Sequence, residues 1–199
     1  MNVNSEILMA KKEEMKIVTD LIKECKRCSL YKSRKNPVNG FGSLDSKVVF
    51  IGEAPGRNED FQGKPFVGRA GKILDDLLKS INLERSKVFI GNILKCRPPN
   101  NRNPLKKEID SCTDYLDKQL KIIKPKIIAP LGNFSSIYIL NKYGFKAEKI
   151  SKIHGKVFEK NTSFGSLKII PLFHPAVAVY NSNKTQILIK DFKIIKELL

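Results

Sequence analysis

The chain has 199 residues, of which 37 are Lys or Arg and 20 are Asp or Glu, so its formal net charge is +17 at pH 7. Apolar and charged fractions of 41% and 29% exclude a disordered or fibrous chain, and the length fits one domain with a real core. No apolar run approaches the roughly 20 residues of a membrane span, and the N-terminus lacks a signal-peptide pattern. We therefore expect a soluble, cytoplasmic protein. Its charge favours a polyanionic partner, nucleic acid or an anionic membrane face, unless it reflects only a general preference for lysine.

The predicted elements alternate along the chain. An amphipathic helix over 5–24 precedes a loop rich in Gly, Asn and Pro, with no regular structure expected before Lys47. Continuous apolar runs predict four buried strands, over 47–52, 88–94, 127–132 and 167–173. Helical patterns cover 70–80, 105–124, 134–143 and 184–199. This alternation predicts an α/β fold, a three-layer α/β/α sandwich with a central four-stranded parallel sheet.

The loops after the first, second and fourth strands carry the unusual residues, and ligands bind beyond the carboxyl ends of strands in such folds. After the first strand, glycines and prolines from Gly52 to Gly56 fix a tight backbone whose N–H groups suit an anionic oxygen. The loop matches neither a Walker motif nor G-x-G-x-x-G. Phe66, farther along, is either a stacking surface or a plug beneath the loop.

Polar side chains occupy the other two strand ends. Asn92 offers a donor and an acceptor, as reading a base edge requires, although a turn-forming Asn is the alternative. His174 follows the fourth strand, and we expect a hydrogen-bond donor or acid there rather than a structural residue. His154 is expected in a turn at the surface.

The four cysteines predict a single Cys₄ centre. Cys25 and Cys28 form a C-x-x-C pair, whereas Cys96 and Cys112 come from distant segments at element boundaries. Disulfides are disfavoured in a reducing compartment, and a thioredoxin-like pair is disfavoured because Cys25 ends a helix instead of following a strand. Ligand count alone leaves zinc and a 4Fe–4S cluster both open.

Several motifs occur together in one order: GEAPG at 52–56, GKPFVGRAG at 63–71, GN at 91–92 with KCRPP at 95–99, and HPA at 174–176. With the four cysteines, they make the chain resemble family 4 uracil-DNA glycosylases, the iron–sulfur type of that superfamily, over almost its whole length. The resemblance implies a single uracil-DNA glycosylase domain over 1–199 that hydrolyses the N-glycosidic bond of uracil in DNA without cutting the strand. It also implies a structural 4Fe–4S cluster tying segment 1–46 to the domain, held by Cys25, Cys28, Cys96 and Cys112.

The resemblance also implies roles for residues at the strand ends. Phe66 would stack on the extruded uracil, and Asn92 would bond its Watson–Crick edge. His174 would stabilise the negative charge that develops on uracil O2, helped by backbone amides of the Glu53–Ala54 turn.

The resemblance implies roles for further positions less directly. Gly56 belongs to the same base-binding turn, and Glu59 matches a residue that crowds the C5 position and excludes the methyl group of thymine. Better-known superfamily members have Asp where Ala54 stands, so Glu53, the nearest carboxylate, is a candidate catalytic residue. Segment 177–181 would be the wedge that fills the gap left by the flipped base, with Tyr180 where many relatives have arginine.

Other hypotheses remain at this point: a non-catalytic basic Cys₄-zinc module that binds nucleic acid, an iron–sulfur electron carrier, or a superfamily relative acting on other deaminated bases. Residues 186–192 loosely resemble a sliding-clamp-binding motif, although packing of Ile189 and Phe192 into the core is the favoured explanation. We expect a monomer with DNA as partner.

Overall fold

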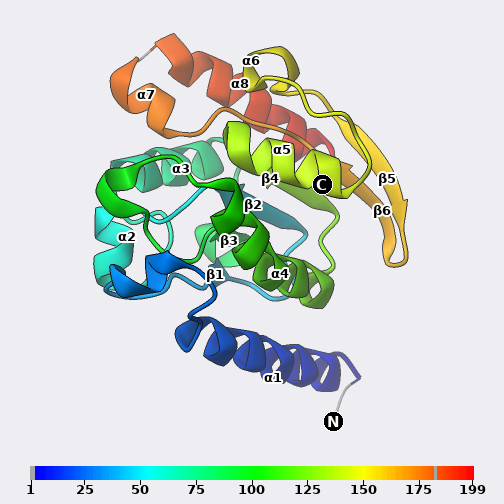
Figure 1. Ribbon diagram of the computed structural model, residues 1–199. Helices are drawn as coiled ribbons and strands as arrows, with labels where there is room; N and C mark the ends of the chain where they lie inside the picture. Colours follow the sequence, from blue (N-terminus) through cyan, green and yellow to red (C-terminus); the bar gives the residue numbers. More distant parts are fainter. Residues whose placement is uncertain (1–2, 182) are drawn as a thin grey trace.

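The computed structural model describes residues 3–181 and 183–199 and has a sheet as its central layer (Figure 1). The sheet has six strands in the order β1-β3-β2-β4-β6-β5. The inner four run parallel: β2 (Val48–Gly52), β3 (Phe89–Asn92), β4 (Ile127–Pro130) and β6 (Gly165–Ile169). The two edge strands are antiparallel to their neighbours: β1 (Phe41–Gly42) and β5 (Phe158–Thr162).

The predicted central sheet of four parallel strands is confirmed, and the structure adds two antiparallel edge strands that were not predicted. β1 has two residues and lies in the loop expected to lack regular structure. β5 reads Phe-Glu-Lys-Asn-Thr, and none of its side chains is fully buried. Edge strands of this kind face solvent and therefore lack the apolar runs that reveal buried strands.

Helices cover both faces of the sheet and form an additional layer. They are α1 (Val3–Lys23), α2 (Arg57–Gln62), α3 (Arg69–Ser80), α4 (Lys106–Ile123), α5 (Asn133–Lys142), α6 (Ile150–Ile153), α7 (Ala176–Tyr180) and α8 (Asn183–Glu197). Short 3₁₀ turns span Ser29–Lys32, Arg85–Lys87 and Pro99–Asn101. The five long helices were predicted. The three of six residues or fewer, α2, α6 and α7, are too short to show a helical period.

Successive side chains of β2 point to opposite layers, as a pleated strand requires. Val48 and Phe50 pack among residues of α3 and α8, and the Phe50 ring stacks on Phe192 with 5.5 Å between centroids. Val49 and Ile51 pack among residues of α4 and α5. Each of these five side chains, including that of Phe192, is at most 1% exposed. Helices therefore cover both faces of the sheet, as the continuous apolar runs predicted.

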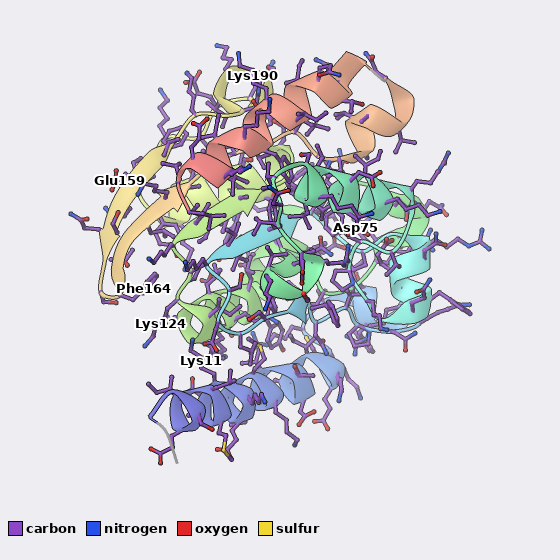
Figure 2. All side chains as sticks on the ribbon, turned by 180° about the vertical axis from the view of Figure 1, so that it is seen from behind. Lys11, Asp75, Lys124, Glu159, Phe164 and Lys190 are labelled. Atoms are coloured by element: carbon purple, nitrogen blue, oxygen red, sulfur yellow. The ribbon has the colours of Figure 1, made fainter. Side chains whose placement is uncertain are left out.

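Helix α1 lies outside this sandwich, against α4 (Figure 1). Its Val18 and Ile22 are buried with Tyr115 and Ile122 of α4 in a separate apolar cluster. Lys11 lies on the side of α1 that faces the body (Figure 2) and donates a 2.7 Å hydrogen bond to a carboxylate oxygen of Asp45. The amphipathic pattern of 5–24 therefore reflects packing on a helix rather than on the sheet.

Phe192 and His154, in the C-terminal half of the chain, are both at least partly buried. Phe192 is completely buried and Ile189 packs against the same cluster, which confirms the packing explanation for residues 186–192. His154 does lie in a turn, but its ring is half-buried: Nδ1 is 2.8 Å from a carboxylate oxygen of Asp191, and the ring centroid is 4.4 Å from that of Phe173. No helix within residues 3–181 and 183–199 is long and apolar enough to cross a membrane.

Candidate active site

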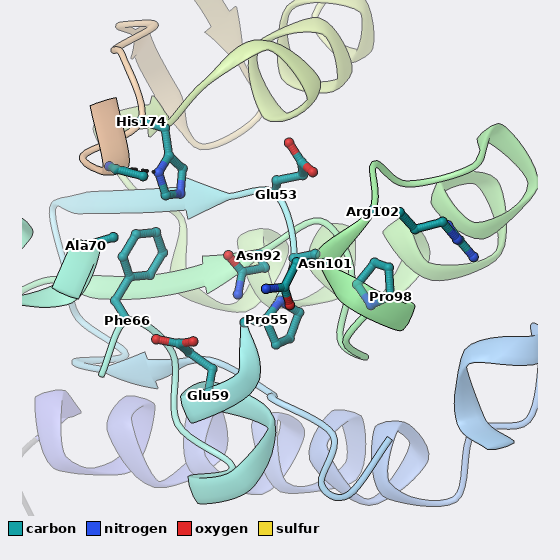
Figure 3. Close-up of a pocket in the computed structure, with 13 residues that line it drawn as sticks. Glu53, Pro55, Glu59, Phe66, Ala70, Asn92, Pro98, Asn101, Arg102 and His174 are labelled. Atoms are coloured by element: carbon teal, nitrogen blue, oxygen red, sulfur yellow. Dashed lines mark hydrogen bonds between the residues drawn. The ribbon is translucent and has the colours of Figure 1, made fainter. Parts of the chain in front are cut away.

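A cavity of about 400 Å³ opens at the carboxyl ends of the parallel strands (Figure 3). The segment after β2, the end of β3 with the loop after it, and the segment after β6 all contribute to its wall. The lining residues are Glu53, Ala54, Pro55, Gly56, Glu59, Phe66, Ala70, Asn92, Pro98, Asn101, Arg102, His174 and Ala176. All seven residues predicted for base binding and catalysis therefore line one cavity, at the edge of the sheet where parallel α/β folds bind ligands.

Phe66 presents its ring to the cavity from a strained backbone. Its φ is +51°, a left-handed value that non-glycine residues rarely adopt, and holding such a residue costs on the order of 1–3 kcal/mol. The ring is 7% exposed and stacks on His174, with 5.5 Å between centroids and 25° between planes. The aromatic ring thus forms part of the cavity wall and also belongs to the buried cluster that contains the α3 residues.

Glu59 holds the loop that carries Phe66. One carboxylate oxygen of Glu59 accepts the backbone N–H groups of both Val67 and Gly68, each at 2.9 Å. Gly71 allows the next helix to approach, because a Cβ there would lie 2.0 Å from the Phe66 carbonyl oxygen. The surrounding structure therefore fixes the ring before any ligand arrives.

Asn92, the last residue of β3, is 2% exposed and faces the cavity (Figure 3). Its side-chain amide makes no hydrogen bond to the described part of the chain, although a buried amide normally has a partner. A Cβ on Gly52 would lie 2.3 Å from the amide oxygen of Asn92 and 2.8 Å from the Phe66 ring. Only glycine at the end of β2 lets the amide and the ring approach each other, and the amide is left available to a ligand.

Lys95 holds the backbone of Asn92 in place, a role that no sequence pattern indicated. Its ammonium group is buried, with the residue 1% exposed, and donates to the Asn92 carbonyl oxygen at 2.9 Å and to the Gln119 side-chain oxygen at 2.8 Å. Burial lowers the pKa of Lys95 to about 8. These bonds fix the end of β3.

His174 is held as a neutral ring with one defined tautomer. The backbone N–H of Ala176 donates to Nδ1 at 3.1 Å, so Nδ1 carries the lone pair and Nε2 carries the proton. Burial in the cavity wall lowers the pKa of His174 to about 4, against a small opposing effect of the Glu59 charge. At neutral pH the residue therefore offers an uncharged N–H donor.

Glu53 supplies a carboxylate at the cavity. Its backbone carbonyl accepts the N–H of Leu94 at 3.0 Å, which joins the segments that follow β2 and β3. Burial raises the pKa of the Glu53 carboxyl above its usual range. Its carboxylate has no hydrogen-bond partner among the described residues and faces space that water or a ligand can fill.

The four cysteines line a small pocket of their own beside the C-terminal end of α1: Cys25, Cys28, Cys96 and Cys112. All four are free thiols. The backbone N–H of Lys95 donates to the Cys112 sulfur and the Arg34 guanidinium to the Cys96 sulfur, both at 3.2 Å. Sulfurs that accept such bonds are typical of thiolate metal centres.

Cys96 and Cys112 are buried, whereas Cys25 and Cys28 are half-buried. Burial raises the pKa of Cys28, Cys96 and Cys112, the last to about 12. Across the residues described, no group of three or more His, Cys, Asp or Glu side chains could hold a single metal ion. Four thiols that line one pocket, with N–H donors to two of the sulfurs, are a donor set that a thiolate-bound metal centre can use.

Comparison with known proteins agrees with this geometry. Residues 39–197 match the family model of the uracil DNA glycosylase superfamily. A type-4 uracil-DNA glycosylase from Sulfurisphaera tokodaii is 46% identical over 94% of this chain and 85% of its own length. The chain belongs to the type-4 uracil-DNA glycosylase family. Type-4 enzymes from Archaeoglobus fulgidus and Thermotoga maritima are 43% and 38% identical, over 92% and 96% of this chain and 94% and 98% of their own lengths.

This type-4 chain has cavity residues to which the sequence analysis assigned no role. Pro55, Ala70, Pro98 and Ala176 lie inside the quoted motifs, whereas Asn101 and Arg102 lie outside them. Arg102 makes paired bonds of 2.9 and 2.6 Å to the completely buried Glu108, which fixes the loop after β3. For Asn101 and Arg102 the only sequence signal is position, because they follow the KCRPP motif in the segment after β3.

The predicted wedge, 177–181, falls mostly on α7 (Ala176–Tyr180). Val177 and Ala178 pack against the cluster that contains the α3 residues. The side chain of Tyr180 lies outside the described part of the structure, so its contact with DNA stays a prediction.

Proposed function

We propose that this type-4 chain removes uracil from DNA by hydrolysing its N-glycosidic bond, releasing free uracil and leaving an abasic site for base excision repair. One observation carries the proposal: an aromatic ring, an unpartnered amide and a neutral imidazole converge on one cavity at the sheet edge. A base inside a DNA duplex cannot reach such a cavity, so the nucleotide must be extruded from the stack.

Uracil recognition requires a flat apolar surface and a matched donor–acceptor pair. The Phe66 ring supplies the surface, and the Asn92 amide supplies both polar groups: its N–H₂ donates to uracil O4, and its oxygen accepts from N3–H. An unpaired buried amide is costly, so a base that satisfies both groups is favoured over one that satisfies neither.

The chemical step separates charge. The bond between N1 and C1′ breaks, its electron pair stays on uracil and spreads to O2 and O4, and the sugar becomes an oxocarbenium ion. The His174 Nε2–H donates to O2 as its charge grows, together with backbone N–H groups of the Glu53–Ala54 turn. Since His174 is already neutral, it stabilises the anion without giving up a proton.

The Glu53 carboxylate takes the catalytic role of the Asp that better-known superfamily members have at the position of Ala54. As an anion at the cavity it stabilises the cationic sugar, and it accepts the proton that water loses on adding to C1′. No enzyme group bonds to the sugar in this scheme, so the reaction leaves the strand intact.

Glu59 sets the choice between uracil and thymine. Its carboxylate lines the cavity but is held by two backbone N–H groups, so it cannot swing aside for a methyl group at C5. The mechanism is steric exclusion by a fixed group.

We also propose that the cysteine centre holds a structural 4Fe–4S cluster. The four thiols would be its ligands, and the cluster would supply a covalent tie between the end of α1, the segment after β3 and helix α4. A brown protein with four iron and four sulfide per chain supports this assignment. Stoichiometric zinc in a colourless protein would contradict it.

The +17 net charge favours DNA as the partner. The affinity for DNA should fall steeply as the salt concentration rises, because phosphate contacts release counterions. A sliding clamp is not part of the proposal, because the motif-like stretch keeps Phe192 completely buried.

The proposal is tested by incubating the protein with an oligonucleotide that contains one uracil and adding borohydride to half of the sample. We expect free uracil, an alkali-labile site and no trapped adduct. A borohydride-trapped protein–DNA adduct would show a covalent lyase instead.

A further inference from the structure

A second hollow of about 470 Å³ lies on the other side of α2 from the base cavity. The helix separates the two: Gly56 and Glu59 line the base cavity, whereas Arg57 and Asn58 line the second hollow. The loop after β3 forms another shared wall, where Arg97 of the second hollow donates a 2.7 Å bond to the side-chain oxygen of Asn101, which lines the base cavity. The two hollows therefore share α2 and the loop after β3 as walls.

Phe61 is an exposed aromatic residue at this hollow. It lies on α2 with 68% of its surface exposed, more than any other large apolar residue among those described. Nothing in the core needs this ring, because α2 buries Asp60 instead. The ammonium group of Lys35 lies 5.2 Å from the ring centroid, a cation–π distance. The residue thus presents a flat apolar surface next to a positive charge.

The charge of the hollow is positive. Lys35, Arg57 and Arg97 line it together with a single carboxylate, that of Asp60. Asp60 is 4% exposed and accepts the backbone N–H of Lys35 at 2.9 Å, so it faces the protein more than the hollow. Cations around an exposed ring are the combination that binds single-stranded nucleic acid, with phosphate on the cations and a base on the ring.

We propose that Phe61, Lys35 and Arg57 form a second DNA subsite, in which the ring stacks on an unpaired base near the uracil and the two cations bind its phosphate. The inference rests on the proposed function, because it takes the neighbouring cavity as the uracil pocket. Bases in a duplex are already stacked on their neighbours, so the subsite favours uracil in single-stranded DNA or beside a disrupted pair.

The test measures binding of a uracil-free single-stranded oligonucleotide, and of the same sequence as a duplex, by fluorescence anisotropy. Phe61→Ala should weaken single-strand binding by at least about fivefold, the lower end of measured base–aromatic stacking effects, and duplex binding by less. Phe61→Trp should retain single-strand affinity and Phe61→Leu should not. Arg57→Gln and Lys35→Gln should each lower the salt slope for the single strand by about 0.7.

The matched control is Phe41→Ala, which removes another exposed phenylalanine, 49% exposed on β1, that lines neither hollow. If Phe61→Ala and Phe41→Ala bind single strands alike, or if Phe61→Leu binds like the unchanged protein, the subsite is wrong. Equal losses for single strand and duplex would also overturn it. Because the oligonucleotide contains no uracil, failure of the unchanged protein to release uracil would instead overturn the proposed function.

Discussion

Replacing Asn92 by Asp is the sharpest test of how the cavity reads its base. The substitution keeps the shape of the side chain but removes the N–H₂ donor to uracil O4 and adds a negative charge. Asn92 is 2% exposed, so little water is present to screen that charge.

Two energy terms set how far Asn92→Asp should lower the rate of uracil release. A hydrogen bond to the uracil anion that forms in the reaction contributes about 1.5–3 kcal/mol. A carboxylate about 5 Å from that anion adds a repulsion of about 3 kcal/mol at an effective dielectric constant near 20. The sum predicts a rate lower by about 10³- to 10⁴-fold, since every 1.4 kcal/mol is a factor of about ten. Asn92→Ala loses only the first term and should cost about 10- to 100-fold.

The assay is single-turnover release of uracil from a single-stranded oligonucleotide at saturating protein, with binding of uracil-free DNA as the control for folding. Lower pH should restore part of the activity of Asn92→Asp, because a protonated carboxyl again offers a donor and an acceptor. Turnover by Asn92→Asp within about threefold of the unchanged protein, against the factors expected above, would remove Asn92 from the site.

Further predictions test Glu59, Glu53, His174 and the cysteine centre. Glu59→Ala leaves two backbone N–H groups without an acceptor and should lower the free energy of unfolding by about 1–3 kcal/mol, measured by urea denaturation, while Glu59→Gln keeps the acceptor and should cost less; equal losses would contradict the bracing role. Glu53→Gln should lower the rate by about 10²-fold or more and remove the fall in rate on the acid side, because the raised pKa places protonation of Glu53 above the usual carboxyl range. In that background the rate should be flat from about pH 5 to pH 7, since a His174 pKa of about 4 keeps the ring neutral throughout. An inflection near the ordinary histidine pKa would show a ring that titrates. Cys112→Ser should lose the iron and lower the melting temperature, and a colourless but equally stable variant would contradict a structural cluster.

The fold was predictable where burial leaves a regular pattern. The strands β2, β3 and β4 are buried along their whole length and read as continuous apolar runs. Their existence and their parallel direction therefore followed from the sequence. β5 is exposed, and α2, α6 and α7 are shorter than two helical turns, so no period marked them.

The site was predictable because strand ends converge in a parallel sheet. Asn92 and His174 could be assigned to one edge from strand positions, whereas the place of Phe66 at the site followed only from the family resemblance. The bonds that prepare them were not predictable: the Glu59 brace, the buried Lys95 ammonium and the Ala176 N–H on His174 depend on side-chain directions and loop conformation. His154 shows the same limit, because its partner Asp191 lies 37 residues away.

The central claim is that this cavity excises uracil and rejects other bases. The direct measurement is release of free base from otherwise identical single-stranded oligonucleotides that carry uracil, thymine, cytosine or hypoxanthine at one position. The proposed mechanism predicts free uracil and abasic sites in equal amounts, with no release of thymine or cytosine. Folded protein that releases no uracil, or that releases hypoxanthine faster than uracil, would contradict it.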